Sequence, residues 1–357
     1  MKKCIAAVLE SPKRFSIREF SIPKVRSSDL LIKVEMVSIC GSDKHLYLGH
    51  HSAASFPKIL GHEFVGYIEK IGEKAAQTYN LKKSDRVTVE PSRLCFSCEY
   101  CLTGTYQMHS PRRSYGVGLT CDKYPYLFGA YSQYIYILSG SKIHKIDKDI
   151  PAESASLSSV IGNGIRWVRT KAKLKCSESI AIVGAGAQGL ATTIAAKEAG
   201  AKPIIVLGIS NDYKKFELAK EFGADHVINI EKKDAIEEVK KLNGGKLADV
   251  VIECSGNRDA IEMAINLARP RKRIVLVGLT GGKGTKINTD LLINRELKVL
   301  GGHGQNWDVE DAVRIINSKR YAIDKIITHK FPLRDVDKAM EFFFQAPPEC
   351  IRIGLIP

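Results

Sequence analysis

A glycine-rich turn between two apolar runs constrains this chain more than any other feature. Residues Ser179–Val183 form an apolar run of strand length, and the pattern Gly-x-Gly-x-x-Gly follows at Gly184, Gly186 and Gly189. An alanine-rich segment with helical periodicity then extends to Gly200, before a second apolar run. We predict a strand, a tight turn, a helix and a parallel strand. The glycines allow the turn, the approach of a pyrophosphate and close helix packing, so the unit indicates a dinucleotide site.

Strand-type runs begin with the two of this unit and continue beyond it, each separated from the next by a stretch of helix length. The six runs are Ser179–Val183, Pro203–Leu207, His226–Ile230, Asp249–Glu253, Arg273–Gly278 and Glu296–Gly301. This alternation is typical of a doubly wound parallel sheet, and we therefore predict a Rossmann dinucleotide-binding domain over residues 159–305.

Residues 1–158 are rich in short β-type runs punctuated by Gly, Pro, Ser and Asp, a pattern that favours a compact antiparallel β-domain. The runs are Asp29–Ile39, Phe64–Gly72, Asp85–Glu90 and Ala130–Ile137. Beyond Asp308 we expect a helix to about Ser318, a strand over Ile326–Phe331, a helix over Arg334–Phe344 and a final strand over Cys350–Ile356. This tail is expected to return to the first domain, so that residues 306–357 complete it. The predicted fold class is α/β with two domains.

Composition narrows the functional classes. The 357 residues are 44% hydrophobic, and no segment approaches the roughly 18 uninterrupted apolar residues of a membrane span. Because Glu10 interrupts the first apolar run before a signal peptide develops, we expect a cytoplasmic protein with no membrane partner. The net charge is +15, but the lysines are spread along the chain beside acidic residues. We expect a solvated surface with some bias toward anionic ligands, and no nucleic-acid partner.

Three groups of metal-binding residue types lie in the first domain. They are Cys40-Gly-Ser42-Asp43-Lys-His45, Gly61-His62-Glu63, and Cys95-x-x-Cys98-x-x-Cys101 followed by His109. In a reducing compartment the cysteine triplet suggests metal rather than disulfides. Taken together and in this order with the glycine motif, the groups resemble the zinc-dependent medium-chain dehydrogenases. In that family a GroES-like β-rich catalytic domain precedes a Rossmann domain, and the resemblance covers essentially the whole chain.

The resemblance implies a catalytic zinc held by Cys40 and His62. Glu63 is a ligand in the polyol dehydrogenases of the family and a neighbour of the metal in others. A further ligand position of the family falls on Ser159, whose hydroxyl is a poor zinc ligand, so Glu63 or a water must complete the site. Asp43 would orient the imidazole of His62.

Two other roles follow from the resemblance. Ser42 and His45 match positions through which the family passes the alcohol proton to solvent, and a hydroxyl and an imidazole suit that relay. Cys95, Cys98, Cys101 and His109 match the lobe that holds a structural zinc. His109 stands where the family usually has Cys, and Cys121 is the alternative fourth ligand.

The expected cofactor is NADP or NAD. Members that bind NAD carry an acid at the end of the second strand, and Gly208 stands there in this chain. The residues expected to surround a 2′-phosphate are Gly208, Ser210, Asn211, Lys214 and Lys215. They favour NADP, whereas Asp212 would favour NAD. Ser255, Val277 and Leu279 match loops beside the adenosine ribose and the nicotinamide.

The resemblance thus implies reversible hydride transfer between a secondary alcohol, most of all a polyol or sugar, and NAD(P). L-threonine-type and sugar-phosphate dehydrogenases are alternatives, and so is a zinc-free NADPH-dependent quinone-type reductase. A further alternative is a non-enzymatic protein that binds NADPH or associates with nucleic acid, and only the net charge supports it. We expect a homo-oligomer, either a dimer or a tetramer. Substrate choice is expected to depend on side chains near Leu46, Tyr47, Arg112 and Tyr115.

Overall fold

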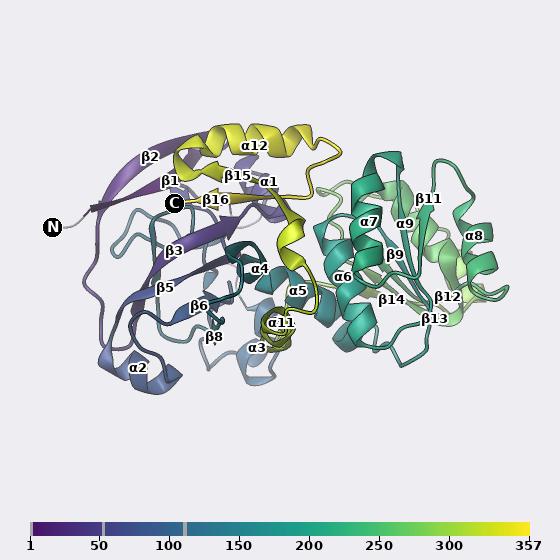
Figure 1. Cartoon of the computed structure of the whole chain (residues 1–357), viewed down its shortest axis with the longest axis horizontal. Coiled ribbons are helices and arrows are strands. Elements are labelled where there is room, and N and C mark those ends of the chain that lie inside the picture. Colours follow the sequence, from purple (N-terminus) through teal and green to yellow (C-terminus); the bar gives the residue numbers. More distant parts are fainter. Residues whose placement is uncertain (1–2, 52–53, 110–112) are drawn as a thin grey trace. The chain divides into compact units, whose positions relative to one another are not determined.

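The computed structural model describes residues 3–51, 54–109 and 113–357, which form two compact units (Figure 1). The first unit runs to Ser159 and resumes at Val313, and the second spans Val160–Ala312. The sequence places the second boundary earlier, at 305/306. The observed boundary falls inside helix α11 (Asp308–Asn317), because its first turn is tied to the second unit by the ion pair of Arg169 with Asp311.

The second unit contains a six-stranded sheet in the order β11-β10-β9-β12-β13-β14, and every neighbouring pair in it is parallel. The strands are β9 (Ile180–Val183), β10 (Ile204–Gly208), β11 (His226–Asn229), β12 (Ala248–Glu253), β13 (Ala268–Leu276) and β14 (Lys298–Gly301). Numbered from β9, this is the order 3-2-1-4-5-6 of a doubly wound dinucleotide-binding sheet. The prediction of a Rossmann-type sheet is confirmed.

Helices cover both faces of this sheet, which is why β9, β10 and β12 are buried along their whole length. The helix α6 packs against β9 and β10, whereas α9 packs against β9, β12 and β13. The helices of the unit are α6 (Ala187–Glu198), α7 (Tyr213–Glu221), α8 (Ala235–Leu242), α9 (Arg258–Leu267) and α10 (Thr289–Asn294), preceded by α5 (Ser158–Ile165) and a π-helical turn over Arg166–Lys171.

The first unit is built from two sheets. A small antiparallel sheet has the order β2-β1-β4, and a larger one has the order β15-β16-β3-β5-β6-β8, with β7 also pairing with β3. The strands are β1 (Lys3–Ser11), β2 (Arg14–Ser21), β3 (Leu30–Ser38), β4 (Lys58–Ile59), β5 (Phe64–Ile71), β6 (Arg86–Val89), β7 (Tyr134–Ile137), β8 (Ile143–Lys145), β15 (Ile327–Pro332) and β16 (Arg352–Ile356). The helices are α1 (Gly41–Tyr47), α2 (Glu73–Tyr79), α3 (Glu99–Leu102), α4 (Ala152–Ser156) and α12 (Val336–Gln345).

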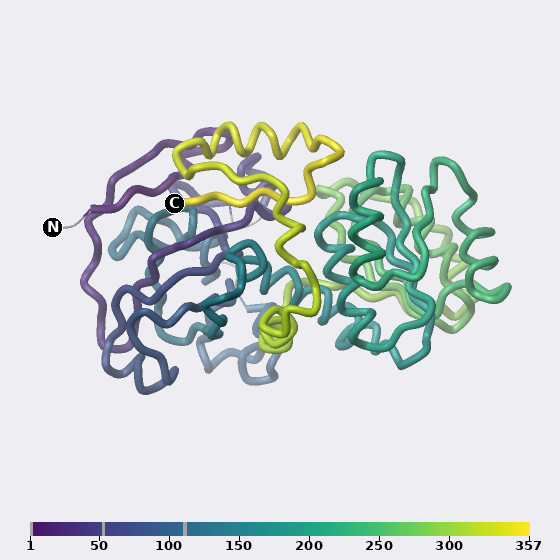
Figure 2. Tube along the Cα trace, viewed as in Figure 1, coloured from purple at the N-terminus to yellow at the C-terminus, as the bar shows by residue number. Residues whose placement is uncertain are grey.

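The antiparallel β-domain expected for residues 1–158 is confirmed, because each described strand pair between β1 and β8 is antiparallel, and the C-terminal strands add one parallel pair. Strands β15 and β16 are parallel, because α12 crosses between them as a connection between parallel strands requires. The tail does return to the first unit, since β16 pairs antiparallel with β3. Figure 2 shows the yellow C-terminal segment running beside the purple strands of the N-terminal part. Within the described residues, no helix has the length and apolar character needed to cross a membrane.

Candidate active site

The first candidate site forms where β3 ends and β5 begins. These strands are antiparallel, and Val37 pairs with Phe64, so the segment after β3 and the segment before β5 meet at one edge. Cys40 follows β3 and caps the N-terminus of α1. His62 and Glu63 immediately precede β5. The ladder therefore brings together two motifs that are more than twenty positions apart in the sequence.

Cys40, His62 and Glu63 offer ligand atoms that all lie within 4.8 Å of one another. A thiolate and an imidazole are ligands that suit zinc, and three protein ligands are typical of a catalytic zinc with an open position. Asp43 Oδ1 lies 3.5 Å from His62 Nδ1, and Ser42 Oγ lies 3.3 Å from His62 Nε2. The ring thus turns Nδ1 toward a carboxylate, as in carboxylate–histidine–zinc arrangements. The residues present fit a zinc ion.

The charges around His62 raise its pKa. Burial acts to lower the pKa of His62, but Asp43, Cys40 and Glu63 raise it, and the result is a pKa of about 10. Burial raises the pKa of Asp43, and His62 opposes that rise. Two buried acidic side chains, Asp43 and Glu63, lie around one imidazole, and buried charges of this kind are paired or bind a metal cation.

Arg352 belongs to none of the sequence motifs, but it lies in β16 and contacts Glu63. Its Nη2 donates to Glu63 Oε2, and Ser38 Oγ donates to the same oxygen at 2.6 Å. Burial works to raise the pKa of Glu63, but Arg352 and His62 hold it below its ordinary value. Both bonds use Oε2, so Oε1 is the oxygen that a metal could take. The sequence does contain a signal for Arg352, which is the one arginine in the otherwise apolar run Cys350–Ile356. A charge in a buried strand needs a partner of opposite charge.

Tyr131 is a second residue of this site that no sequence motif indicates. Its hydroxyl donates to Asp43 Oδ2 at 3.0 Å, and the N–H of Cys40 donates to the same oxygen at 2.8 Å. The two bonds fix the carboxylate that faces His62.

Ser159, the position of the further family ligand, is buried at the start of α5. The neighbouring Ser158 is linked to β6 through a 2.9 Å contact with Thr88.

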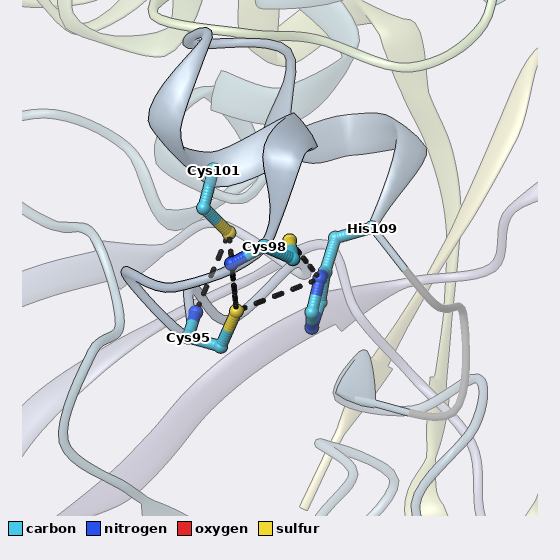
Figure 3. Close-up of side chains that lie close together, drawn as sticks. All are labelled: Cys95, Cys98, Cys101 and His109. Atoms are coloured by element: carbon cyan, nitrogen blue, oxygen red, sulfur yellow. Dashed lines mark hydrogen bonds between the residues drawn. The ribbon is translucent and has the colours of Figure 1, made fainter.

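The second candidate metal site lies on the segment Cys95–His109, where α3 and a short 3₁₀ turn bring four side chains together (Figure 3). Cys95 Sγ and Cys101 Sγ are 3.8 Å apart, and His109 Nδ1 lies 3.1 Å from Cys98 Sγ and 4.0 Å from Cys95 Sγ. With zinc–sulfur bonds of about 2.3 Å, two sulfurs of a tetrahedral site lie about 3.8 Å apart. The four donors fit a closed Cys₃His zinc site.

Hydrogen bonds to sulfur support this geometry. The N–H of Cys98 donates to Cys95 Sγ at 3.3 Å, and Ser97 Oγ donates to the same sulfur. Bonds from Ser97 and Cys98 lower the pKa of Cys95 to about 5, which favours the thiolate that metals bind. The alternative ligand Cys121 is instead buried in the hydrophobic core, where burial raises its pKa to about 11.

Replacing Cys98 by Ser, or His109 by Ala, is expected to lower the metal content from about two zincs per chain to about one and to reduce stability more than chemistry. A closed site offers no position to substrate but contributes directly to folding. Metal analysis and thermal unfolding measure both effects. Cys121→Ala is the matched control and should keep both zincs. Loss of both metals, or of neither, in the Cys98 and His109 variants would contradict a separate Cys₃His site.

The candidate dinucleotide site lies at the carboxyl ends of β9, β12 and β13. Gly184 has φ +104°, and a Cβ added there would lie 3.1 Å from the backbone nitrogen of Ser255. A Cβ on Gly189 would lie 1.9 Å from the carbonyl oxygen of Gly184, so the helix packs tightly on the turn. A Cβ on Gly186 would meet nothing within 4 Å. Open space at Gly186, beside the N-terminus of α6, fits a pyrophosphate.

The loops that follow β12 and β13 adjoin each other at this edge. A Cβ on Gly256 would lie 2.5 Å from the carbonyl oxygen of Leu279. Ser255 donates from its backbone and its hydroxyl to Glu253 Oε1, at 2.7 and 2.6 Å. Leu279 is exposed. The structure thus brings the predicted Ser255 segment and the Val277–Leu279 segment to the same edge as the glycine turn.

The residues expected at the cofactor's second phosphate lie at the end of β10 and directly after it. Gly208 is the last residue of β10, Ser210 and Asn211 lie in a 3₁₀ turn over Ser210–Asp212, and α7 begins with Tyr213, Lys214 and Lys215.

Among the residues expected to shape the substrate pocket, Leu46 and Tyr115 are fully buried in the core of the first unit. They therefore do not line an open pocket, and Tyr47 stacks on Phe15. Arg112 lies outside the described residues.

Comparison with known proteins identifies the family of the chain. Residues 26–148 match the family model of the alcohol dehydrogenase GroES-like domain, and residues 187–318 match that of zinc-binding dehydrogenases. The probable alcohol dehydrogenase of Mycobacterium tuberculosis (strain CDC 1551 / Oshkosh) is 33% identical, over 98% of this chain and 91% of its own. The erythritol/L-threitol dehydrogenase of Mycolicibacterium smegmatis is 31% identical, over 100% of this chain and 98% of its own.

The fold also has a close match among solved structures. A protein from Sinorhizobium meliloti 1021, provisionally described as a zinc-binding dehydrogenase and bound to NADP, superposes with a TM-score of 0.88 at 26% identity, over 100% of both chains. The chain belongs to the zinc-dependent medium-chain dehydrogenases, the alcohol dehydrogenase family with a GroES-like domain and a Rossmann domain.

Proposed function

We propose that this chain oxidises a secondary alcohol, a polyol or sugar, reversibly with NAD(P), through a zinc site formed by Cys40 and His62 with Glu63. The observation that carries the proposal is the group of three donors within 4.8 Å, beside a carboxylate that faces His62 Nδ1. A zinc ion supplies Lewis acidity that lowers the pKa of an alcohol, and NAD(P) accepts the hydride.

The protein's own residues orient these donors. Asp43 holds the imidazole of His62, and is itself held by Tyr131 and the N–H of Cys40. Arg352 keeps Glu63 ionised at neutral pH. The donor set thus stays preorganised, with His62 and Glu63 buried and Cys40 half-buried, which limits its rearrangement during the reaction.

Ser42 and His45 are the proposed proton relay. Both lie on α1, three positions apart, so they share one face of the helix. Ser42 Oγ, 3.3 Å from His62 Nε2, is placed to receive the alcohol proton and to pass one to His45. Burial, with Lys44 and His50, lowers the pKa of His45, so its imidazole is neutral at physiological pH and able to accept a proton.

The substrate class is proposed from the relatives. The Mycolicibacterium protein is named as an erythritol/L-threitol dehydrogenase, and this supports a polyol. L-Threonine-type and sugar-phosphate substrates are the alternatives. The test is a screen of polyols, aldoses, L-threonine, sugar phosphates and quinones with each cofactor, in which the absorbance of NAD(P)H is followed. Turnover of a polyol or sugar above all other substrates supports the proposal, and a preference for a quinone without any alcohol oxidation contradicts it.

Other finer predictions accompany this function. The sequence favours NADP, and the Sinorhizobium structure is bound to NADP, but the contacts of Asp212 and Lys215 oppose that choice in this chain. The homo-oligomer and the cytoplasmic location stay predictions, and so does the preference for NADP that residue type alone suggests.

A further inference from the structure

The end of β10 carries a carboxylate although its last residue is a glycine. A Cβ added to Gly208 would lie 2.7 Å from Asp212 Oδ2, and 2.9 and 3.0 Å from two ring carbons of Phe216. Within an aspartate side chain, bond lengths of the usual size place the carboxylate oxygens about 2.4 Å from Cβ. Asp212 thus positions an oxygen close to where an aspartate at 208 would have one.

Three contacts hold Asp212 in this place. The N–H of Asp212 donates to the carbonyl of Ile209 at 2.9 Å, which closes the turn after β10. The N–H of Ile209 donates to Asp212 Oδ2 at 3.0 Å, and Lys215 Nζ donates to Oδ1 at 2.8 Å. The side chain of Asp212 is therefore fixed against the strand end, and Gly208 provides the space for it.

The groups expected to meet a 2′-phosphate are engaged elsewhere. Lys215 is paired with Asp212, with both side chains largely buried. Lys214 is exposed, and its Nζ lies 5.9 Å from the ring centroid of Tyr213. The N–H of Ser210 donates to Glu231 Oε2 at 2.8 Å, which places a second carboxylate beside the turn. The strand end thus carries two acids, one lysine that is paired with an acid, and the exposed Lys214.

We propose that Asp212 takes the role of the missing strand-end acid: its carboxylate accepts hydrogen bonds from the adenosine ribose hydroxyls, and the chain prefers NAD. The inference rests on the proposed function, because it requires a dinucleotide at the turn between β9 and α6. An ionised carboxylate offers about four acceptor sites, and the two bonds from Ile209 and Lys215 leave room for a ribose diol. A 2′-phosphate would instead meet Asp212 and Glu231 with like charge.

Equilibrium binding of NAD and of NADP to the whole protein, without substrate, tests this directly. Calorimetry should show tighter binding of NAD than of NADP by at least about tenfold. Asp212→Asn should weaken NAD binding by about ten- to a hundredfold, since bonds to a charged acceptor are lost. The same change frees Lys215, so the binding of NADP should hold or improve. The ratio of the two affinities is a readout that a merely structural role would not move.

A matched control is Asp234→Asn, which makes the same acid-to-amide change at the cap of α8, where Asp234 accepts from the N–H groups of Ile236 and Glu237. It should leave the ratio of affinities unchanged. Gly208→Ala is a second variant that retains the carboxylate but displaces it, because the added methyl would approach Oδ2 to 2.7 Å. It should weaken NAD binding while circular dichroism shows a folded chain.

Tighter binding of NADP than of NAD by the unmodified protein, or an unchanged ratio in Asp212→Asn, would overturn the assignment of Asp212 and leave the proposed dehydrogenase function standing. Binding of neither cofactor would overturn the proposed function itself, and the assignment with it.

Discussion

Replacing Cys40 by alanine is expected to abolish alcohol oxidation while leaving cofactor binding nearly intact. Cys40 is one of the three donors of the candidate catalytic zinc site, and a bound metal supplies several kcal/mol of charge stabilisation, or at least about a thousandfold in rate. The glycine turn at Gly184, Gly186 and Gly189 belongs to the other compact unit. Steady-state kinetics and calorimetric binding of the cofactor measure the two effects separately.

The control for this variant is Cys4→Ala, which removes a buried thiol from β1 in the same unit, outside both candidate metal groups. Its kcat should stay close to that of the unmodified protein, with some loss of stability. Undiminished turnover by Cys40→Ala would show that the metal is held elsewhere. Loss of cofactor affinity together with turnover would point to a general folding defect.

Replacing Arg352 by methionine is expected to destabilise the chain at neutral pH by about 3–5 kcal/mol, because the buried carboxylate of Glu63 loses the guanidinium that pairs with it. In the native protein the pKa of Glu63 lies below its ordinary value, so the pair stabilises the fold above the unfolded pKa. That contribution is lost as the pH falls through the lowered pKa. The difference between the two proteins should therefore be largest at neutral pH and shrink in acid.

Denaturant unfolding at several pH values measures this difference. Lys330→Met is the matched control on the adjacent strand β15, because Lys330 forms an exposed ion pair with Glu153, which should contribute little. The double variant Glu63→Gln with Arg352→Met should recover part of the loss, since no buried charge then remains unpaired. An Arg352→Met protein as stable as the control variant at neutral pH would contradict the role of this ion pair.

Local patterns in the sequence were sufficient for much of the fold. Apolar runs predict the strands of the second unit, most clearly β9, β10 and β12, because strands covered on both faces are apolar along their length. The metal donors were also visible, since Cys95, Cys98 and Cys101 are close in sequence and their residue type is diagnostic. Joining the Cys40 motif to the His62 motif needed the family resemblance, because only the pairing of β3 with β5 brings them together.

Other features could not be predicted, because they depend on contacts between distant segments or on the exact path of a turn. Arg352 meets Glu63 across 289 sequence positions. The parallel pairing of β15 with β16 depends on the crossover through α12. At the end of β10 the sequence shows a glycine and two lysines, but the turn folds Asp212 back onto Gly208 and pairs it with Lys215. Residue type therefore suggested one cofactor, whereas the geometry supports the other.

The most direct test of the central claim, that alcohol oxidation depends on a zinc ion at Cys40 and His62, is removal and return of the metal. Zinc content and the rate of NAD(P)H formation from the best polyol or sugar should be measured before chelation, after it, and after zinc is restored. We predict that turnover falls to background when the catalytic zinc is removed and returns in proportion to the zinc restored. A metal-free chain that oxidises the alcohol at an undiminished rate would contradict the claim.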